Sequence, residues 1–223
     1  MKNLIVKVCG MRDSANIRTV AAMGVDWIGL VFNPQSERNV TMISTHAGII
    51  PDRASNESID FGAGKVGVFT DEMGQNIITR TVNFKLTHIQ FDGNEPPTLL
   101  RNLRRTLSPD MCPDIRFIKT IRISQPEDME ICKEYEDCAD YFLFEAPSVD
   151  INVSAARFDW HLLDAYDGQT PFILGDISPE DGARINMINH PRFAGINLTE
   201  HFDAQPGMKN TNVLRNFLLQ IRK

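Results

Sequence analysis

The sequence lacks long apolar runs and an excess of positive charge, and both absences exclude large classes of protein. No apolar run reaches the roughly 20 residues that a membrane span needs, and the first residues show no signal-peptide pattern. We therefore expect a cytoplasmic protein with no membrane partner. The 23 Lys and Arg residues against 29 Asp and Glu give a net charge of −6. This charge argues against a nucleic-acid partner, although a local site for a small phosphorylated molecule remains compatible with it.

Cysteine is also scarce, and no two cysteines are spaced as a C-x-x-C pair, which disfavours zinc and thioredoxin-like sites. The four cysteines are Cys9, Cys112, Cys132 and Cys138. In a reducing compartment we expect free thiols, and the last three are expected to serve as small packing residues. Cys9 differs because it directly follows the apolar run Leu4–Val8 and precedes Gly10, which is the pattern of a strand that ends in a tight turn.

What the sequence does contain is a regular alternation of short apolar runs and amphipathic stretches. The expected strands are Leu4–Val8, Trp27–Phe32, Lys65–Phe69, Leu86–Gln90, Ile115–Ile121, Ala139–Phe144, Pro171–Leu174 and Phe193–Leu198. The expected helices are Asp13–Met23, Met42–Ile50, Met73–Asn83, Pro97–Leu107, Gln125–Tyr135, Phe158–Tyr166, Pro179–Ile188 and Asn212–Arg222. Pro51–Gly64 is expected to form an unusually long loop.

Eight strand-helix pairs without a break in composition predict an α/β fold, a single-domain (β/α)8 TIM barrel over residues 1–223. An open, doubly wound sheet is the structural alternative. In either fold, chemistry takes place at the carboxyl ends of the strands. Cys9 stands at such an end, and Lys7 is expected on the same face of the strand. A thiol acts as a general base only where a cation or backbone N–H groups lower its pKa, so the alternative for Cys9 is an inert core thiol.

Eight segments, in chain order, carry a family resemblance over nearly the whole chain. They are Lys7–Met11, Gly24–Phe32, Ser36–Val40, Val66–Phe69, Ile89–Gly93, Lys119–Arg122, Phe158–Trp160 and Pro206–Lys209. Together they resemble the phosphoribosylanthranilate isomerase family of tryptophan biosynthesis. The resemblance implies an aldose–ketose isomerase that carries out an Amadori rearrangement of N-(5-phosphoribosyl)anthranilate. It also implies no cofactor, no metal, and a monomer or homodimer.

The resemblance assigns roles to particular residues. Cys9 stands at the position of the family's general base, and Glu145 stands where the family has an aspartate as general acid. Arg38, Gln90 and Asp92 are expected to bind the substrate, with Asp92 replacing a histidine of the family pattern.

The loops after the seventh and eighth strands are expected to bind the substrate's phosphate. Their candidate residues are Gly175, Asp176, Thr199, Glu200 and His201. Asp176 replaces a glycine and Glu200 a serine, and each carboxylate would repel a phosphate charge about 4–5 Å away by roughly 3–4 kcal/mol at an effective dielectric near 20. The segment 152–155 also lacks the glycine-rich pattern of the family. Two alternatives therefore stay open: an isomerase or epimerase for another small sugar, and a catalytically silent binding protein.

Overall fold

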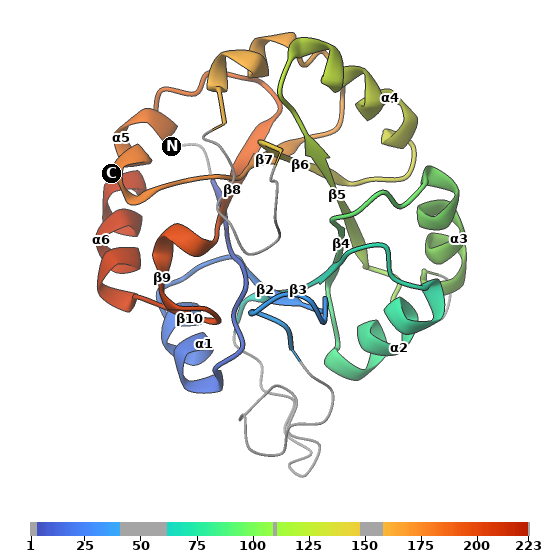
Figure 1. Ribbon diagram of the computed structural model, residues 1–223, viewed down its shortest axis with the longest axis horizontal. Helices are drawn as coiled ribbons and strands as arrows, with labels where there is room; N and C mark the ends of the chain where they lie inside the picture. The colour runs from blue at the N-terminus through green and yellow to red at the C-terminus, as the bar shows by residue number, and fades with distance from the viewer. Residues whose placement is uncertain (1–3, 41–61, 109–110, 148–157, 223) are drawn as a thin grey trace.

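A computed structural model describes residues 4–40, 62–108, 111–147 and 158–222, and these form a closed barrel of eight parallel strands inside a ring of helices (Figure 1). The strands are β1 (Ile5–Val8), β2 (Trp27–Val31), β3 (Gly64–Phe69), β4 (His88–Phe91), β5 (Arg116–Arg122), β6 (Tyr141–Glu145), β7 (Phe172–Leu174) and β8 (Phe193–Leu198). Each strand pairs with the next one along the chain, and β8 pairs with β1. This closure excludes the open-sheet alternative and confirms the predicted barrel.

The register between β1 and β8 brings the first and last strands together close to the mouth of the barrel. Lys7 lies opposite Asn197, and the backbone N–H of Cys9 donates to the carbonyl of Leu198 at 2.8 Å. The carboxyl ends of all eight strands meet at one end of the barrel, as a parallel barrel requires. This end is the mouth of the barrel.

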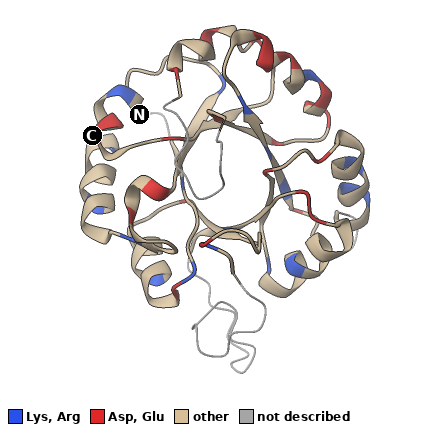
Figure 2. Ribbon diagram, in the orientation of Figure 1, with Lys and Arg blue, Asp and Glu red and all other residues tan. Residues whose placement is uncertain are grey.

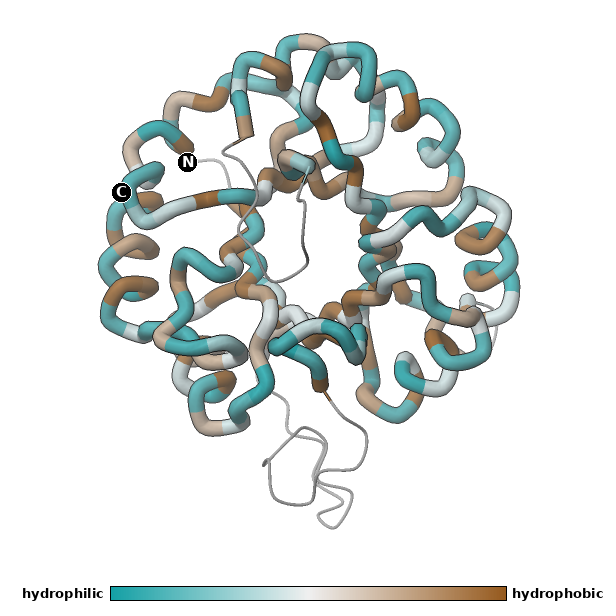
Figure 3. Tube along the Cα trace, viewed as in Figure 1, coloured by the Kyte–Doolittle hydropathy of each residue, from teal (hydrophilic) through white to brown (hydrophobic). Residues whose placement is uncertain are grey.

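Amphipathic helices cover the outside of the barrel. They are α1 (Ser14–Ala21), α2 (Gly74–Phe84), α3 (Pro97–Leu107), α4 (Cys132–Tyr135), α5 (Gly182–Ile185) and α6 (Thr211–Ile221). In α3, for example, Leu100, Leu103 and Leu107 are buried while the residues between them face outward. Apolar positions recur in this way along the helices in Figure 3. The longest described helices have 11 residues, and none is long and apolar enough to cross a membrane.

Three of the expected helices are wrong in type or length. Residues 125–135 form a 3-10 helix η1 (Pro126–Ile131) before the short α4, and residues 158–166 form only the 3-10 helix η2 (Trp160–Ala165). Residues 179–188 form η3 (Pro179–Asp181) and the four-residue α5. Each begins with a side-chain cap that a helix start predicts. Their apolar patterns are too short to continue an α-helix, because isolated short helices are marginal.

One further difference lies near the C-terminal end of the chain. A short hairpin, β9 (Asp203–Gln205) with β10 (Met208–Lys209), was not predicted from the sequence; it follows the 3-10 helix η4 (Glu200–Phe202) after β8. The expected helix Met42–Ile50 lies outside the described residues. So does the expected loop Pro51–Gly64, apart from its last three residues.

The core has two layers. A large cluster fills the space between the sheet and the helices, and a smaller one fills the inside of the barrel. The inner cluster consists of Cys9, Trp27, Val66, Val68, Ile118, Leu143 and Ile173. Cys132 and Cys138 are buried in the outer cluster and Cys112 packs against it, so these three cysteines are packing residues as predicted.

A buried ion pair outside the barrel orders two of the loops at its mouth. The ammonium of Lys119 lies 3.1 Å from the Glu95 carboxylate and also donates to the carbonyl of Gly93. Glu95 in turn accepts hydrogen bonds from the backbone N–H groups of Asp71 and Gly93. A single carboxylate therefore ties the loop after β3 to the loop after β4.

We expect Glu95→Ala to lower the free energy of unfolding by about 3 kcal/mol, because it leaves the Lys119 charge buried without its partner. Urea unfolding followed by circular dichroism measures the change. The matched control is Glu130→Ala, which removes an ion pair with Lys133 that is exposed on both sides and should cost far less than the buried pair, because water screens it. Equal losses in the two variants would contradict the structural role given to Glu95.

Candidate active site

Cys9 lies directly after β1, inside the barrel mouth, and is 5% exposed. Gly10 follows it with a φ of +75°, a left-handed conformation that favours glycine. This turn points the backbone N–H groups of Gly10 and Met11 at the carbonyl of Gly29. Gly29 also gives the thiol its space, since a Cβ there would lie 2.5 Å from the Cys9 sulfur. The thiol is thus held in a fixed place by two glycines.

A buried lysine provides positive charge next to this thiol. Lys209, on β10, is 2% exposed; its ammonium donates to the Thr199 carbonyl at 2.9 Å and forms an ion pair with Asp203. Burial lowers the pKa of Lys209, while the charges of Asp203 and Cys9 oppose that effect. Lys209 is therefore a cation at the mouth that interacts electrostatically with Cys9.

Arg38 joins the same network from the loop after β2. Its guanidinium is 2.8 Å from the Asp203 carboxylate, and its stem packs over Gly10, where a Cβ would come within 2.5 Å of Arg38 Cδ. The structure therefore places Arg38 at the mouth beside Cys9, with Asp203 as its partner.

Polar side chains from β1, β4, β5, β6 and β8 converge at the mouth above the apolar interior. This polar layer consists of Lys7, Gln90, Asp92, Thr120, Arg122, Glu145 and Asn197. Figure 2 shows acidic and basic residues both on the strands and loops of the barrel and on the helices around it. The layer links five strands through direct side-chain hydrogen bonds, so its geometry is fixed by the barrel itself.

Glu145 is the centre of the polar layer. One oxygen of its carboxyl accepts from Arg122 at 2.8 Å, and the other accepts from the Asn197 amide at 3.1 Å. Burial raises the pKa of Glu145, and the charge of Asp92 adds to the rise, whereas Arg122, Lys7 and Asn197 work against it. A carboxyl whose pKa is raised can hold a proton closer to neutral pH, which is what a general acid needs.

Gln90 on β4 and Asp92 directly after it belong to the same layer, two strands from Glu145. Gln90 accepts a hydrogen bond from Lys7 and donates to Asp92 at 3.1 Å, and Asp92 also accepts from Thr120 at 2.8 Å. The second Asp92 oxygen lies 3.3 Å from Arg122. The structure thus brings both expected substrate-binding residues to the mouth and connects them to Glu145 through Arg122.

The loop after β7 turns the carboxyl of Asp176 toward β6. Asp176 has a φ of +53°, is nearly buried, and accepts a hydrogen bond of 2.6 Å from the backbone N–H of Ala146. Burial, together with the charge of Glu145, raises the pKa of Asp176 to about 7. The side chain that the sequence placed beside a phosphate therefore contacts the backbone directly after Glu145.

The loop after β8 contributes Thr199, Glu200 and His201. Glu200 is partly buried, and hydrogen bonds from the backbone and from Thr199 lower its pKa despite burial, with further help from His201 and Arg38. His201 is exposed, and Gly175 packs against the Glu145 side chain. All ten sequence-predicted site residues thus stand on the loops or strand ends at one face of the barrel.

Several residues of the mouth were not predicted from the sequence. Thr120 and Arg122 follow the inward-facing Ile118 at period two on β5, so the alternation along that strand was the available signal. Asn197 holds the corresponding kind of position on β8. Asp203 belongs to the hairpin that no pattern indicated. Lys209 was noticed only as part of a motif. Among the described residues, no group of three or more His, Cys, Asp or Glu side chains is arranged to hold a metal ion.

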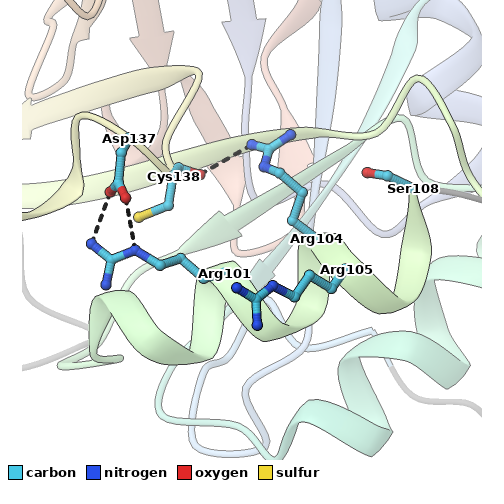
Figure 4. A pocket seen from close by; sticks show the side chains of 6 residues that line it. All are labelled: Arg101, Arg104, Arg105, Ser108, Asp137 and Cys138. Carbon is cyan, nitrogen blue, oxygen red and sulfur yellow. Dashed lines mark hydrogen bonds and ion pairs between the residues drawn. The ribbon is translucent and has the colours of Figure 1, made fainter.

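A second pocket lies on the outer wall between α3 and the segment that precedes β6 (Figure 4). It is lined by Arg101, Arg104, Arg105, Ser108, Asp137 and Cys138. Arg101 binds both oxygens of Asp137 at 2.8 Å, and Arg104 donates to the Cys138 carbonyl at 3.0 Å. Burial raises the pKa of the Cys138 thiol to about 11, so this pocket contains no activated nucleophile.

A closed (β/α)8 barrel with a thiol and a buried carboxyl at its mouth defines the class, an enzyme that works at the carboxyl ends of its strands. Comparison with known proteins gives the family. The family model of N-(5'-phosphoribosyl)anthranilate (PRA) isomerase matches residues 6–220, and the chain belongs to this family.

Relatives and solved structures agree with this assignment. The N-(5'-phosphoribosyl)anthranilate isomerase of Parabacteroides distasonis is 38% identical over 98% of this chain and 93% of its own. The enzyme of the same name from Phocaeicola vulgatus is 33% identical over 99% and 98%. The crystal structure of phosphoribosyl anthranilate isomerase from Thermus thermophilus has a TM-score of 0.76 at 21% identity and 98% coverage of both chains, which confirms the fold.

Proposed function

We propose that this chain catalyses the Amadori rearrangement of N-(5'-phosphoribosyl)anthranilate to a carboxyphenylamino-deoxyribulose phosphate, with Cys9 as general base and Glu145 as general acid. One observation carries the proposal. This chain, a member of the family, places Cys9 and Glu145 at the same barrel mouth, and each of them interacts with its own cation. Lys209 lies near Cys9, and Arg122 binds Glu145. Each of the two groups thus interacts with its own charged partner, and Arg122 fixes the position of the Glu145 carboxyl.

The reaction divides into two proton transfers. Glu145 gives its proton to the ring oxygen of the ribose as the C1–O bond breaks, and the lone pair of the anthranilate nitrogen forms the C1=N double bond of a Schiff base. Cys9 as thiolate then takes the proton from C2; the C2–H electron pair forms the C1=C2 double bond, and the C1=N π electrons move onto the nitrogen to give an enolamine. Its tautomerisation yields the ketone. One proton leaves Glu145 and one arrives on Cys9, so neither side chain needs an outside oxidant or reductant.

The substrate's two anionic groups would lie at different parts of the mouth. Arg38 would bind the anthranilate carboxylate, since a guanidinium offers two parallel donors to a carboxylate. The phosphate would lie at the loops after β7 and β8. The Asp176 carboxyl accepts a hydrogen bond from the Ala146 N–H, and the Gly175 N–H donates to the Phe144 carbonyl at 2.8 Å. This arrangement supports a phosphate contact through the backbone N–H of Asp176 instead of repulsion by the Asp176 carboxylate.

The direct test is turnover of the purified protein, followed through the fluorescence of anthranilate-derived substrate. Complementation of a tryptophan auxotroph that lacks this step provides an independent readout. We expect turnover and growth. A soluble, folded protein that shows neither would overturn the proposal, and so would turnover that survives loss of Cys9.

Arg38→Met should raise KM by about 10-fold or more with a smaller change in kcat, because a charge-assisted hydrogen bond to a carboxylate contributes about 1.5–3 kcal/mol. Steady-state kinetics over a range of substrate concentrations separates the two parameters. The control is Arg18→Met on the exposed surface of α1, which should leave both parameters unchanged. A fall in kcat alone would contradict a binding role for Arg38.

The cytoplasm is the compartment we infer for this enzyme. Cys9, Cys112, Cys132 and Cys138 are all free thiols in the structure, a state that a reducing compartment maintains. Its partner would be the phosphorylated small-molecule substrate. The expectation of a monomer or homodimer stays a prediction.

A further inference from the structure

In the described part of the mouth formed by β4 to β7, three partly or fully buried carboxyl groups face two cations. Asp92 after β4, Glu145 on β6 and Asp176 after β7 all lie in or against the polar layer. The cations that face them are Lys7 from β1 and Arg122 from β5. An unpaired buried carboxylate is costly, so a group in this position takes up a proton instead.

The contacts place the Asp176 carboxyl at the backbone N–H of the residue that follows Glu145. Gly175 packs on the Glu145 side chain so closely that a Cβ at this glycine would overlap it. The next residue, Asp176, folds back with a left-handed backbone and binds the N–H of Ala146 at 2.6 Å. Two consecutive residues of the β7 loop therefore contact two consecutive residues at the end of β6.

We propose that Asp176 is a positioning residue that shares one proton with Glu145 and thereby keeps a proton available on the general acid. The inference rests on the proposed role of Glu145. Without Asp176, the ion pair of 2.8 Å with Arg122 would favour the ionised form of Glu145, which has no proton to give. The negative charge of Asp176 works against Arg122.

The charges that face the pair agree with a single shared proton. Arg122, Asp92, Lys7 and the Asn197 amide face Glu145. Glu145, Glu200, Arg122 and the Ala146 N–H face Asp176, and burial with the Glu145 charge raises the pKa of Asp176 to about 7. Because the two carboxyls interact, their titration belongs to the pair and not to either residue alone.

Asn197 is suited to both protonation states of Glu145. Its amide nitrogen donates to Glu145 Oε1 at 3.1 Å, while its oxygen is buried and has no hydrogen-bond partner in the described structure. An amide that turns over presents this oxygen, which accepts a hydrogen bond from a protonated carboxyl. The side chain can therefore follow the proton on Glu145 without any movement of the backbone.

The shared proton is tested by carboxyl 13C NMR titration, which does not depend on activity. The wild type, Asp176→Asn and Glu145→Gln are compared with Asp and Glu carboxyl carbons labelled. We expect a wild-type carboxyl with a midpoint near pH 7, and a fall of that midpoint by about one pH unit or more in each variant. A near-neutral midpoint that neither variant moves would overturn the proposal, as would a wild type without such a midpoint.

The consequence for catalysis is tested by the pH dependence of kcat. The acid must be protonated, so its titration gives the limb on which kcat falls as pH rises. Asp176→Asn should lower the pKa of Glu145 and so move that limb to lower pH by about one unit. At pH values above the limb, kcat should then be roughly 10-fold lower than in the wild type. At pH values below the limb, kcat should be nearly unchanged. The KM should change less than kcat.

Asp176→Gly separates charge from structure. The asparagine variant keeps an oxygen that can accept from the Ala146 N–H, whereas glycine removes both the charge and the contact. We expect both variants to move the limb equally. If only glycine moves it, Asp176 acts through structure alone and the proposal is overturned. If the NMR midpoint moves in both variants but kcat keeps its profile, the shared proton is supported and Glu145 loses its assignment as the acid.

Discussion

Cys9→Ser is expected to lower kcat by about 10³–10⁴-fold, because proton transfer by a positioned side chain contributes up to this amount. Serine fills nearly the same space between Gly29 and the carbonyl of Leu198, so the fold should tolerate it. A hydroxyl has a much higher pKa than a thiol, however, and it forms almost no anion beside Lys209. The C2 proton would then have no base. Steady-state turnover of the purified variant measures the loss.

The matched control is Cys132→Ser. This thiol is buried in the outer core, and burial raises its pKa to about 12, with Glu136 adding to the rise. The control should keep wild-type kcat, although a buried hydroxyl can lower its stability. Circular dichroism and the urea midpoint show whether both variants are folded. A Cys9→Ser variant within 10-fold of wild type would contradict the role of Cys9 as base.

The barrel was predictable because its strands obey strong local rules. Runs such as Trp27–Val31 are buried on both faces and read as continuous apolar segments, as parallel strands do. The amphipathic spacing of α3 and α6 likewise appears directly in the sequence. The short helices after β5, β6 and β7 were overpredicted because a few apolar residues at helical spacing do not reveal where a helix stops. Asp128 and Asp181 close capping boxes at the start of two of these segments, which mark where a helix begins but not its type or length.

The positions of the site residues in the fold could be predicted from the sequence, but their hydrogen-bond and ion-pair partners could be predicted much less well. Cys9 and Glu145 stand at strand ends that the sequence identifies, and the register of the barrel brings them to one mouth. The partners depend on which side chain reaches which across the barrel, information that no local pattern holds. Asp176 illustrates the limit: its charge suggested repulsion of a phosphate, whereas its left-handed backbone turns the carboxyl toward Ala146.

Glu145→Gln is expected to lower kcat by about 10²–10⁴-fold, because glutamine keeps the shape and hydrogen bonds of the side chain but has no acidic proton to give. The ribose ring oxygen would then have to leave without protonation, and ring opening would limit the rate. The substitution removes the charge partner of Arg122, which keeps Asp92 at 3.3 Å. Some loss of stability is therefore expected, and turnover is measured well below the unfolding midpoint.

Glu145→Asp provides the more informative comparison. It retains the acid but draws the carboxyl back by about one methylene, and a misplacement of about 1 Å costs on the order of 100-fold in rate. We expect this variant to be slower than wild type yet faster than Glu145→Gln, with kcat still falling at high pH. Glu130→Gln, a change at an exposed carboxylate, serves as the control and should leave kcat unchanged. If Glu145→Gln keeps wild-type kcat, the acid is another group. If the aspartate variant is no faster than the glutamine variant, the position of the carboxyl matters as much as its acidity, because the shorter side chain no longer reaches the place where Arg122 and Asn197 hold the Glu145 carboxyl.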